Sequence, residues 1–563
     1  MKRIAFPLAI AVAIFGLIGC STGKAEQAKH SEVYSAPAES PTSEVVLFDN
    51  LGGHHHPITT DSDLVQRYFD QGLIFAYGFN HSEAERAFME AARLDPECAM
   101  CYWGGALVLG PNINALMEDE AVPKAYDRVQ KAVKLSSRVS AREQAYIQAL
   151  AKRYGPEPLK DRTLLDVAYA NAMREVARNF PDDSDAATLF GEALMVLHPW
   201  DYWQEDGKPQ PWTKEILTVL EFALKLDHNN PGANHLYLHA VEASPNPERG
   251  LASADRLRDL VPGIGHMVHM PSHIYIRTGH YHEGSLANER AIKSDQGYAA
   301  KTKALGLYPI LYMPHNYHFL VATASMEGQS EKAIEVARDM SMHTDKQMMR
   351  EPGFGTLQHF WITPLYAFIR FGKWDDILAE PAPPQDLIYP RGVYHYARGM
   401  AFTRKGRLQE AQDELNQLGL IASDPALREV TIWDINTTWS LMQIASEVLA
   451  GELAAKRGDY DKAISHLERG VRLEEELNYD EPPPWLIPVR QSLGAILLDA
   501  GRPAEAEKVY RQDLLHYPEN GWSLYGLHKS LVAQGKIEAA ADAKKRAEIA
   551  WARADVSLSA SRF

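Results

Sequence analysis

The chain has 563 residues, of which 45% are apolar and 23% charged, a composition typical of a water-soluble fold. Its formal net charge is −16 and it contains no basic run, which argues against nucleic acid as a partner. Beyond the N-terminal segment, no stretch offers the roughly 20 continuous apolar residues that a membrane-spanning helix needs.

The N-terminus has the parts of an export signal. Met1–Arg3 is positively charged, Leu8–Ile18 is apolar, and Leu17–Cys20 ends the segment. This order resembles the signal of bacterial lipoproteins, which implies cleavage before Cys20 and lipidation of that residue. An ordinary secretory signal or an uncleaved anchor is the alternative. Ser21 in place of an aspartate resembles the outer-membrane sorting pattern of Gram-negative lipoproteins.

A tether is expected after the lipidated cysteine. Residues 20–45 are rich in Ser, Ala, Glu and Pro, the composition of a flexible linker. We therefore expect a signal peptide at 1–19, a tether at 20–45, and a protein held by its lipid on a bacterial membrane. The membrane expected is the outer one, with the body of the protein in the periplasm.

The only cysteines after Cys20 are Cys98 and Cys101. In an oxidising compartment a local disulfide is the favoured interpretation of this pair. Metal binding and redox exchange stay open as alternatives, although the sequence shows neither a thioredoxin-like βαβ pattern nor a second cysteine pair.

A pattern of small and large residues begins at Tyr68 and closes at Asp95-Pro96. Its members are Gly72, Phe75, Ala84, Phe88 and Ala91. They match the characteristic positions of the tetratricopeptide repeat (TPR), a helix–turn–helix unit of 34 residues. Later copies agree at Gly458–Ala463, at Leu493–Pro518 and at Gly535–Ala547. The chain thus resembles the TPR family over most of its length.

The resemblance implies an all-α fold, a TPR-type α-solenoid. We expect a right-handed superhelix of about ten helix pairs, in which the first helix of each pair lines the concave face. Residues 46–345 are predicted to form an N-terminal array with a histidine-rich concave face. Residues 346–563 are predicted to form a C-terminal array.

Histidines recur with the period of the repeat. Shifting the chain by 34 residues places His235 under His269 and His239 under His273. Eight histidines fall on one stripe of successive first helices: His235, His239, His266, His269, His273, His315, His318 and His359. In the TPR family the residues at these positions face the groove and contact ligands.

The spacing of these histidines suits a metal ion. His235/His239 and His269/His273 are i, i+4 pairs, the geometry by which one helix supplies two imidazoles. Glu242 follows His239 by three residues and could add a carboxylate or act as a base. Imidazole suits Zn, Cu, Fe or Ni, and the sequence does not choose among them. Alternatively, the histidines are hydrogen-bonded parts of a groove wall.

Two longer strings resemble a group of bacterial exported repeat proteins. They are Asn234–Glu242 and His269–Gly279. This second resemblance supports the fold and the location of the site, and implies no reaction.

Two functions follow from these patterns. The favoured one is an envelope-tethered binding or scaffold protein whose groove takes a metal ion, a peptide or a partner protein. The alternative is a metalloenzyme, a hydrolase or an oxidase, with Glu242 as the catalytic candidate. Convergence of the histidines on one point, with a coordination position left open, would distinguish the second from the first.

Overall fold

The structure, a computed structural model, describes residues 45–304 and 306–563. The expected signal peptide at 1–19, Cys20 and nearly all of the expected tether lie outside the described residues. Within the described ranges the chain is almost entirely helical, with 25 α-helices and one hairpin of two short strands. None of the described helices is long and apolar enough to cross a membrane.

The first half holds these elements: α1 (Asp63–Tyr77), α2 (His81–Leu94), α3 (Ala99–Leu107), α4 (Ala121–Leu135), η1 (Ser136–Arg138), α5 (Ala141–Leu150), α6 (Thr163–Asn179), α7 (Ser184–Val196), α8 (Thr213–Leu226), α9 (Pro231–Val241), η2 (Pro247–Gly250), α10 (Leu251–Leu260), α11 (Gly265–His269), α12 (Pro271–Arg277) and α13 (Tyr281–Lys301).

The second half holds these elements: η3 (Tyr308–Tyr312), α14 (Met313–Met326), α15 (Ser330–His343), η4 (Met348–Arg350), α16 (Gly355–Arg370), α17 (Trp374–Ala379), α18 (Ile388–Arg404), α19 (Leu408–Ala422), η5 (Pro425–Arg428), β1 (Thr431–Ile432), β2 (Asn436–Thr437), α20 (Thr438–Lys456), α21 (Tyr460–Glu475), α22 (Val489–Asp499), α23 (Pro503–His516), α24 (Gly521–Ala533) and α25 (Ile537–Ala550).

Consecutive helices pack in pairs, so the predicted all-α fold of helix pairs is confirmed. Since α11 and α12 together make one first helix, broken at Pro271, the described helices form twelve pairs, close to the expected number. Small residues permit close packing at the predicted positions. A Cβ added to Gly72 or Gly104 would lie within 2.8 Å of the Phe88 ring, so glycine lets both neighbouring helices contact that side chain.

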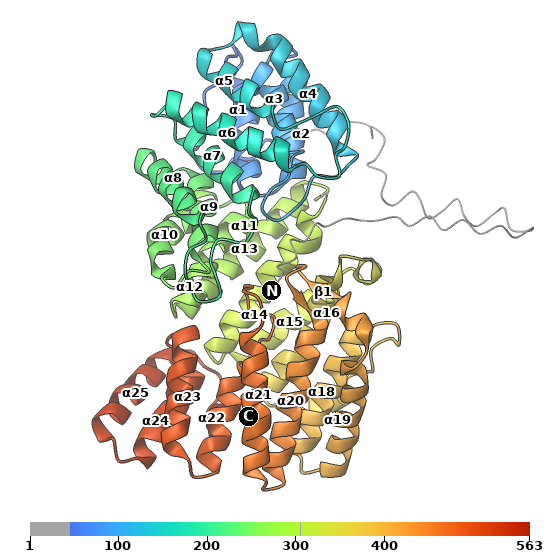
Figure 1. Ribbon diagram of the computed structural model, residues 1–563, viewed down its shortest axis with the longest axis vertical. Coiled ribbons are helices and arrows are strands. Elements are labelled where there is room, and N and C mark those ends of the chain that lie inside the picture. The colour runs from blue at the N-terminus through green and yellow to red at the C-terminus, as the bar shows by residue number, and fades with distance from the viewer. Residues whose placement is uncertain (1–44, 305) are drawn as a thin grey trace, which may run out of the picture.

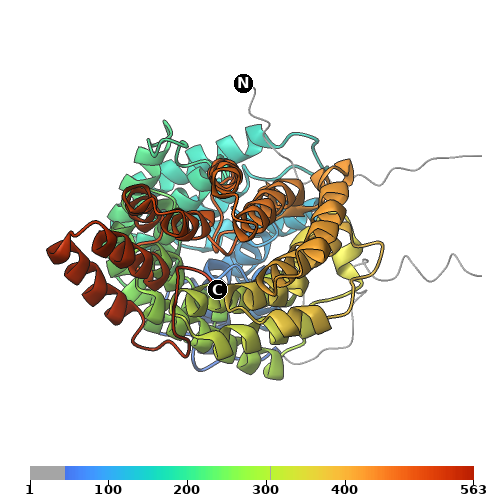
Figure 2. The same cartoon turned by 90° about the horizontal axis from the view of Figure 1, so that it is seen from below.

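The two halves of the chain each fold back on the helices in the middle (Figures 1 and 2). At the N-terminal side, Tyr298 of α13 hydrogen-bonds Glu83 of α2 across 215 residues. At the C-terminal side, the indole nitrogen of Trp522 in α24 donates to the carbonyl of Ser325 in α14 at 2.9 Å. The first helices from α9 to α16 are therefore enclosed rather than left on an open face.

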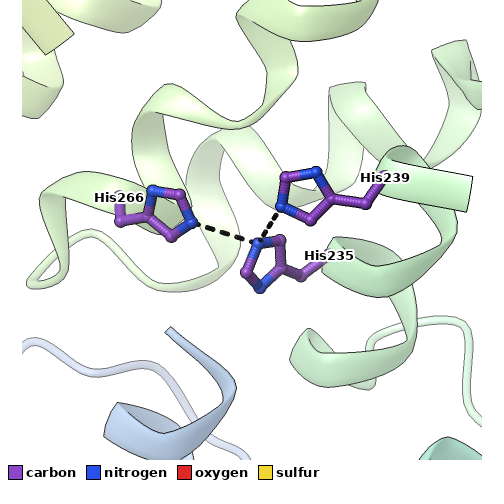
Figure 3. Close-up of side chains that lie close together, drawn as sticks. All are labelled: His235, His239 and His266. Carbon is purple, nitrogen blue, oxygen red and sulfur yellow. Dashed lines mark hydrogen bonds between the residues drawn. The ribbon is translucent and has the colours of Figure 1, made fainter. Parts of the chain in front are cut away.

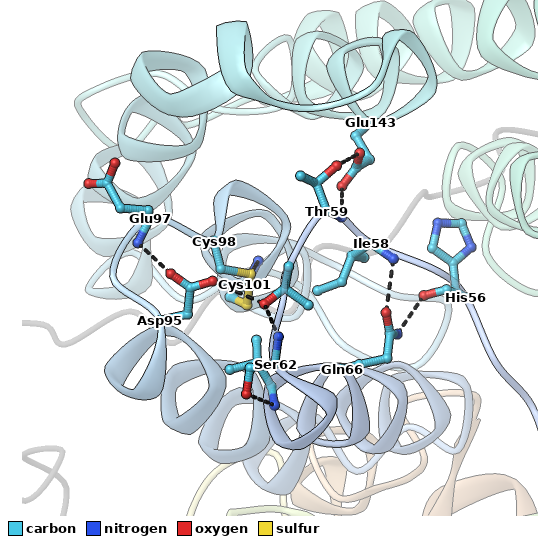
Figure 4. The surroundings of a disulfide bond; sticks show 12 residues. His56, Ile58, Thr59, Ser62, Gln66, Asp95, Glu97, Cys98, Cys101 and Glu143 are labelled. Atoms are coloured by element: carbon cyan, nitrogen blue, oxygen red, sulfur yellow. Dashed lines mark hydrogen bonds between the residues drawn. A yellow bond between two sulfur atoms is a disulfide. The ribbon is translucent and has the colours of Figure 1, made fainter.

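Residues 45–62, which we call the strap, precede α1 without regular structure. Figure 4 shows the strap lying against the first repeats. The amide and hydroxyl of Thr59 both donate to the Glu143 carboxylate at 2.6 Å, and the amide of Ile58 donates to Gln66. The strap thus joins α1 to α5.

Candidate metal centre

Six of the eight predicted histidines lie together in the interior. Each has a relative exposure of 8% or less: His235 and His239 on α9, His266 and His269 on α11, His273 on α12, and His315 on α14. The histidines predicted to line the groove are therefore buried rather than exposed to solvent. The groove is closed because both ends of the chain pack onto the helices that would have lined it.

We call His235, His239 and His266 the first triad (Figure 3). The Nε2 atom of His235 lies 2.9 Å from Nε2 of His239 and 3.2 Å from Nε2 of His266. Asn230 caps α9 by accepting from the Ala233 amide, which fixes the start of the helix. His235 and His239 lie one turn apart on this helix, so their spacing is fixed with it. Three imidazole nitrogens therefore converge on one point.

Hydrogen-bond acceptors next to His235 and His239 show which ring nitrogen of each carries the proton. Nδ1 of His235 lies 2.6 Å from the carbonyl oxygen of Tyr77, and Nδ1 of His239 lies 2.7 Å from Oε1 of Glu242. Both partners only accept hydrogen bonds, so both Nδ1 atoms carry a proton. A neutral imidazole then has a lone pair at Nε2, and two lone pairs face each other at 2.9 Å. That contact is repulsive unless a cation lies between the nitrogens.

We call His269, His273 and His315 the second triad, and it repeats this arrangement. Nε2 of His269 lies 2.9 Å from Nε2 of His273, and one ligand atom of each histidine lies within 4.8 Å of the others. Nδ1 of His269 donates to Oδ1 of Asn288, whose amide nitrogen is fixed by the carbonyl of Gly284. The second triad therefore also turns Nε2 lone pairs toward each other.

Glu242 connects the two triads. Its carboxylate accepts from Nδ1 of His239 in the first triad and from Nδ1 of His273 in the second, at 2.7 and 2.5 Å. Burial would raise its pKa, but the His273 charge and the hydrogen bond from His239 hold the pKa at about 2. Ring centroids of His239 and His273 are 5.6 Å apart, so the triads are immediate neighbours.

Burial favours the neutral, metal-binding form of five of the six triad histidines. Burial lowers the pKa of five of them below the usual 6.5: His235, His239, His266, His269 and His315. Neighbouring imidazoles lower the pKa of these five further. A metal ion therefore does not have to displace protons from these ligands at neutral pH.

Aromatic side chains enclose the two triads. The Phe79 ring lies 4.5 Å from His235, and the Phe319 ring lies 4.5 Å from His273. Trp200 contacts His239 edge-on at 5.0 Å, and Trp433 contacts His315 at 5.4 Å. Phe79, Trp200 and Trp433 all have positive φ, at 56°, 59° and 53°.

A left-handed backbone is uncommon for bulky residues, and such conformations gather at functional sites. Sequence reasoning did not identify Phe79, Trp200 or Trp433, because each comes from a turn or loop far from the triads in the chain. The aromatic, proline-rich stretch around Trp200 was the one available signal.

Two buried acids in the loop between α21 and α22, Asp480 and Glu481, lie near Glu242. Oδ2 of Asp480 and Oε2 of Glu481 are buried there without a hydrogen-bond partner. Burial raises the pKa of Glu481 to about 7, although Arg277 and His273 favour its charged form. Cations in the triads would offset the cost of ionising these acids.

The other predicted site residues lie outside the triads. His318 and His359 are buried together as a separate pair. Cys98 and Cys101 form a disulfide at the start of α3, so they hold no metal in this oxidised state (Figure 4). The metal alternative for the cysteines is therefore not supported.

A third cluster joins the strap to α7. His54 and His56 contact the carboxylate of Asp185 at 3.1 and 2.8 Å. Asp185 also accepts from Tyr77 and Asn230. Because its partners already satisfy this carboxylate, we interpret the cluster as a fastening of the strap rather than as a metal site.

No protein-family model and no curated protein matches the sequence. Among solved structures, the APC/C hetero-tetramer Cut9–Hcn1 is similar at a TM-score of 0.31 and 14% identity, covering 87% of this chain and 78% of that chain. Human IFIT1 as a dimer with PPP-AAAA is similar at 0.29 and 11%, covering 86% and 91%. We draw nothing about ligands from these similarities.

Proposed function

We propose that this protein is a metalloprotein that holds two transition-metal ions side by side, one in each triad. The observation that carries the proposal is the orientation of the imidazoles. Tyr77, Glu242 and Asn288 place protons on Nδ1, and the Nε2 lone pairs that remain converge in two sets. A hydrogen-bond acceptor at the other ring nitrogen, which fixes the tautomer and orientation of a ligand histidine, is typical of metal centres.

The burial of the triads favours metal binding over peptide binding. A peptide in the groove would need exposed side chains, whereas the triad histidines are almost completely buried. A plain packing role would need each Nε2 to face a donor, which the facing lone pairs do not provide. Any partner protein would bind elsewhere on the helix pairs, and that remains a prediction.

Copper is the metal that we favour. All six side chains that would bind metal in the two triads are imidazoles, because both carboxylate oxygens of Glu242 contact Nδ1 groups instead. Open iron sites use a carboxylate beside two histidines, and nitrogen ligands bind copper most strongly among divalent first-row metals. Two neighbouring ions also repel each other least when each carries one charge, as Cu(I) does. Zinc, which three histidines also hold in catalytic sites, is the other outcome of the test.

The number of protein ligands in each triad is compatible with a metalloenzyme. Three protein ligands leave a fourth position for a water or a substrate. Two adjacent copper ions would supply two-electron chemistry. An oxidase that transfers two electrons and two protons from a reduced organic substrate to dioxygen, giving the oxidised substrate and hydrogen peroxide, therefore fits better than a hydrolase. In this proposal Glu242 orients His239 and His273 instead of acting on the substrate.

The cellular location is proposed from the N-terminal sequence alone. The signal at 1–19 and Cys20 support a lipid anchor in the outer membrane, with the metal centre in the periplasm. Copper reaches an oxidising compartment of this kind without competition from cytosolic thiols.

Metal analysis tests the proposal. The full-length protein is purified in mild detergent, without a histidine tag, from cells given mixed metals. We expect at least two tightly bound ions per chain, and about one fewer in either His235→Ala or His269→Ala. His343→Ala is the matched control, because His343 is an exposed histidine on α15. Equal metal in all four proteins, each with an unchanged helical circular dichroism spectrum, would refute the proposal.

A further inference from the structure

His318 and His359 form a histidine pair that neither triad includes. They come from α14 and α16, the first helices of adjacent pairs, and are 1% and 0% exposed. Their ring centroids are 5.0 Å apart and the ring planes are nearly perpendicular, at 85°. The two imidazoles therefore meet in the interior without contact with solvent.

Three of the four nitrogens in this pair have no hydrogen-bond partner. They are Nδ1 and Nε2 of His318 and Nε2 of His359. Buried side-chain nitrogens are nearly always hydrogen-bonded, so an imidazole with neither nitrogen bonded requires an explanation. Since the rings are this close, one ion between them would occupy a nitrogen of each.

The fourth nitrogen has the kind of support that a ligand histidine has. Nδ1 of His359 lies 2.7 Å from the hydroxyl of Tyr389, which lies 3.3 Å from the hydroxyl of Tyr366. This contact fixes the ring of His359 and leaves its Nε2 free. Oriented ligands of this type are typical of metal sites.

The surroundings of the pair select the charge of the ion. Both rings lie in the interior, at 1% and 0% exposure, where charge is costly. Within the described residues the ring nitrogens have no carboxylate partner, in contrast to the triads, where Glu242 contacts His239 and His273. An ion here would therefore bring uncompensated charge into an apolar interior, and a single charge costs least.

The number of available ligands also favours a singly charged ion. Divalent zinc takes four ligands in a structural site, and only two imidazoles are available in this pair. Cu(I) is the common biological ion that is singly charged, binds imidazole and accepts as few as two ligands.

We propose that His318 and His359 form a third metal site, separate from the triads, that binds one Cu(I) ion with Tyr389 orienting His359. The site goes beyond the proposed function and does not depend on it, since it shares no residue with either triad. His318 is one turn beyond His315 of the second triad on α14, so an ion at this site would lie close to that triad.

Cu(I) titration of the full-length protein, with bicinchoninate as the competing chelator, tests the site. We expect the wild type to withhold three ions per chain from the chelator. His318→Phe, which keeps an aromatic ring in the interior, should withhold two. His343→Phe, at an exposed position, is the control and should still withhold three.

A second variant protects the test from a folding defect. Tyr389→Phe removes only the hydroxyl that contacts His359, and it should weaken one Cu(I) equivalent by about tenfold while the other two are unchanged. Unaltered stoichiometry in His318→Phe together with unaltered affinity in Tyr389→Phe would overturn the site. Loss of ions in His235→Ala or His269→Ala reports on the triads, so failure of the third site and failure of the proposed function are read separately.

Discussion

Oε2 of Glu242 lies 2.5 Å from Nδ1 of His273, a residue that follows it by 31 positions on the next first helix. An ionised carboxylate can only accept, so it places the proton of His273 on Nδ1 and leaves the lone pair on Nε2. The other oxygen of Glu242 does the same for His239. One buried side chain thus orients one ligand in each triad.

Glu242→Gln should weaken metal binding at both triads. The amide keeps the size of the side chain but presents an NH₂ group to one of the two Nδ1–H groups. We expect metal affinity to fall about 10- to 100-fold, the usual effect of losing a residue that orients a ligand. Competition with a chelator measures it. Glu248→Gln, at an exposed position nearby, is the control, and a loss equal in both variants would contradict the role of Glu242.

Metal should stay bound in mild acid. The pKa values of His235, His266, His269 and His315 lie well below 6.5, so these ligands remain neutral as the pH falls through 6.5. We expect the ions to be retained from neutral pH down to about pH 5.5, where ordinary histidine ligands release metal. Dialysis at stepped pH followed by metal analysis measures the release.

The same lowered pKa values make the stability of the apoprotein sensitive to mild acid, whereas metal binding is not. Its unfolded state takes up protons on these histidines near pH 6.5, while the folded state does not. The free energy of unfolding of the apoprotein should therefore fall as the pH decreases below 6.5.

Release of metal near pH 6.5 would show that the ligands are not buried as described.

The strap should depend on pH in a different way. Burial would lower the pKa of His54, but the charge of Asp185 raises it above 6.5. Burial would raise the pKa of Asp185, but His54 and His56 hold it well below 3.8. The contribution of His54 is complete below 6.5 and is lost as the pH rises through its raised pKa. That of Asp185 is complete above 3.8 and is lost in stronger acid.

Asp185→Asn should abolish this dependence. Breaking a buried ion pair on one side costs about 3 kcal/mol, so the free energy of unfolding should fall by about that amount near pH 6. The difference from the wild type should shrink as the pH rises above the pKa of His54. Urea unfolding at a series of pH values measures it, with exposed Asp182→Asn as the control. A difference that stays constant with pH would exclude the ion pair.

The disulfide should matter little for the metal centre. Cys98 and Cys101 are three residues apart, and so short a loop gains about 2 kcal/mol from cross-linking. We expect Cys98→Ser/Cys101→Ser to lose about that much stability and to keep its metal, as judged by urea unfolding and metal analysis of one preparation. Loss of metal in this variant would restore the metal-binding interpretation of the cysteines.

The repeat pattern predicted much of this molecule. The contact of Gly72 with Phe88 was predictable because helix packing within one repeat is local in sequence. The i, i+4 pairs His235/His239 and His269/His273 were predictable for the same reason, since helical spacing alone puts each pair on one face.

The grouping into triads was not predictable from spacing. His266 joins His235 and His239, whereas His269, three residues further on the same helix, joins His273 and His315. Spacing along one helix does not say which histidine of a neighbouring helix each ring meets. Burial was missed as well. It depends on contacts such as Trp522 with Ser325, between segments almost 200 residues apart, which no local pattern reports.

X-ray absorption at the copper K-edge of the copper-loaded, full-length protein tests the paired centre most directly. The account predicts about three nitrogen ligands per copper at about 2 Å, with the outer-shell scattering of imidazole rings. It also predicts that His235→Ala and His269→Ala lower the number of nitrogen ligands per copper or the amount of copper bound. A spectrum dominated by sulfur or carboxylate ligands, or one that these two substitutions leave unchanged, would contradict the assignment of the two triads as metal sites.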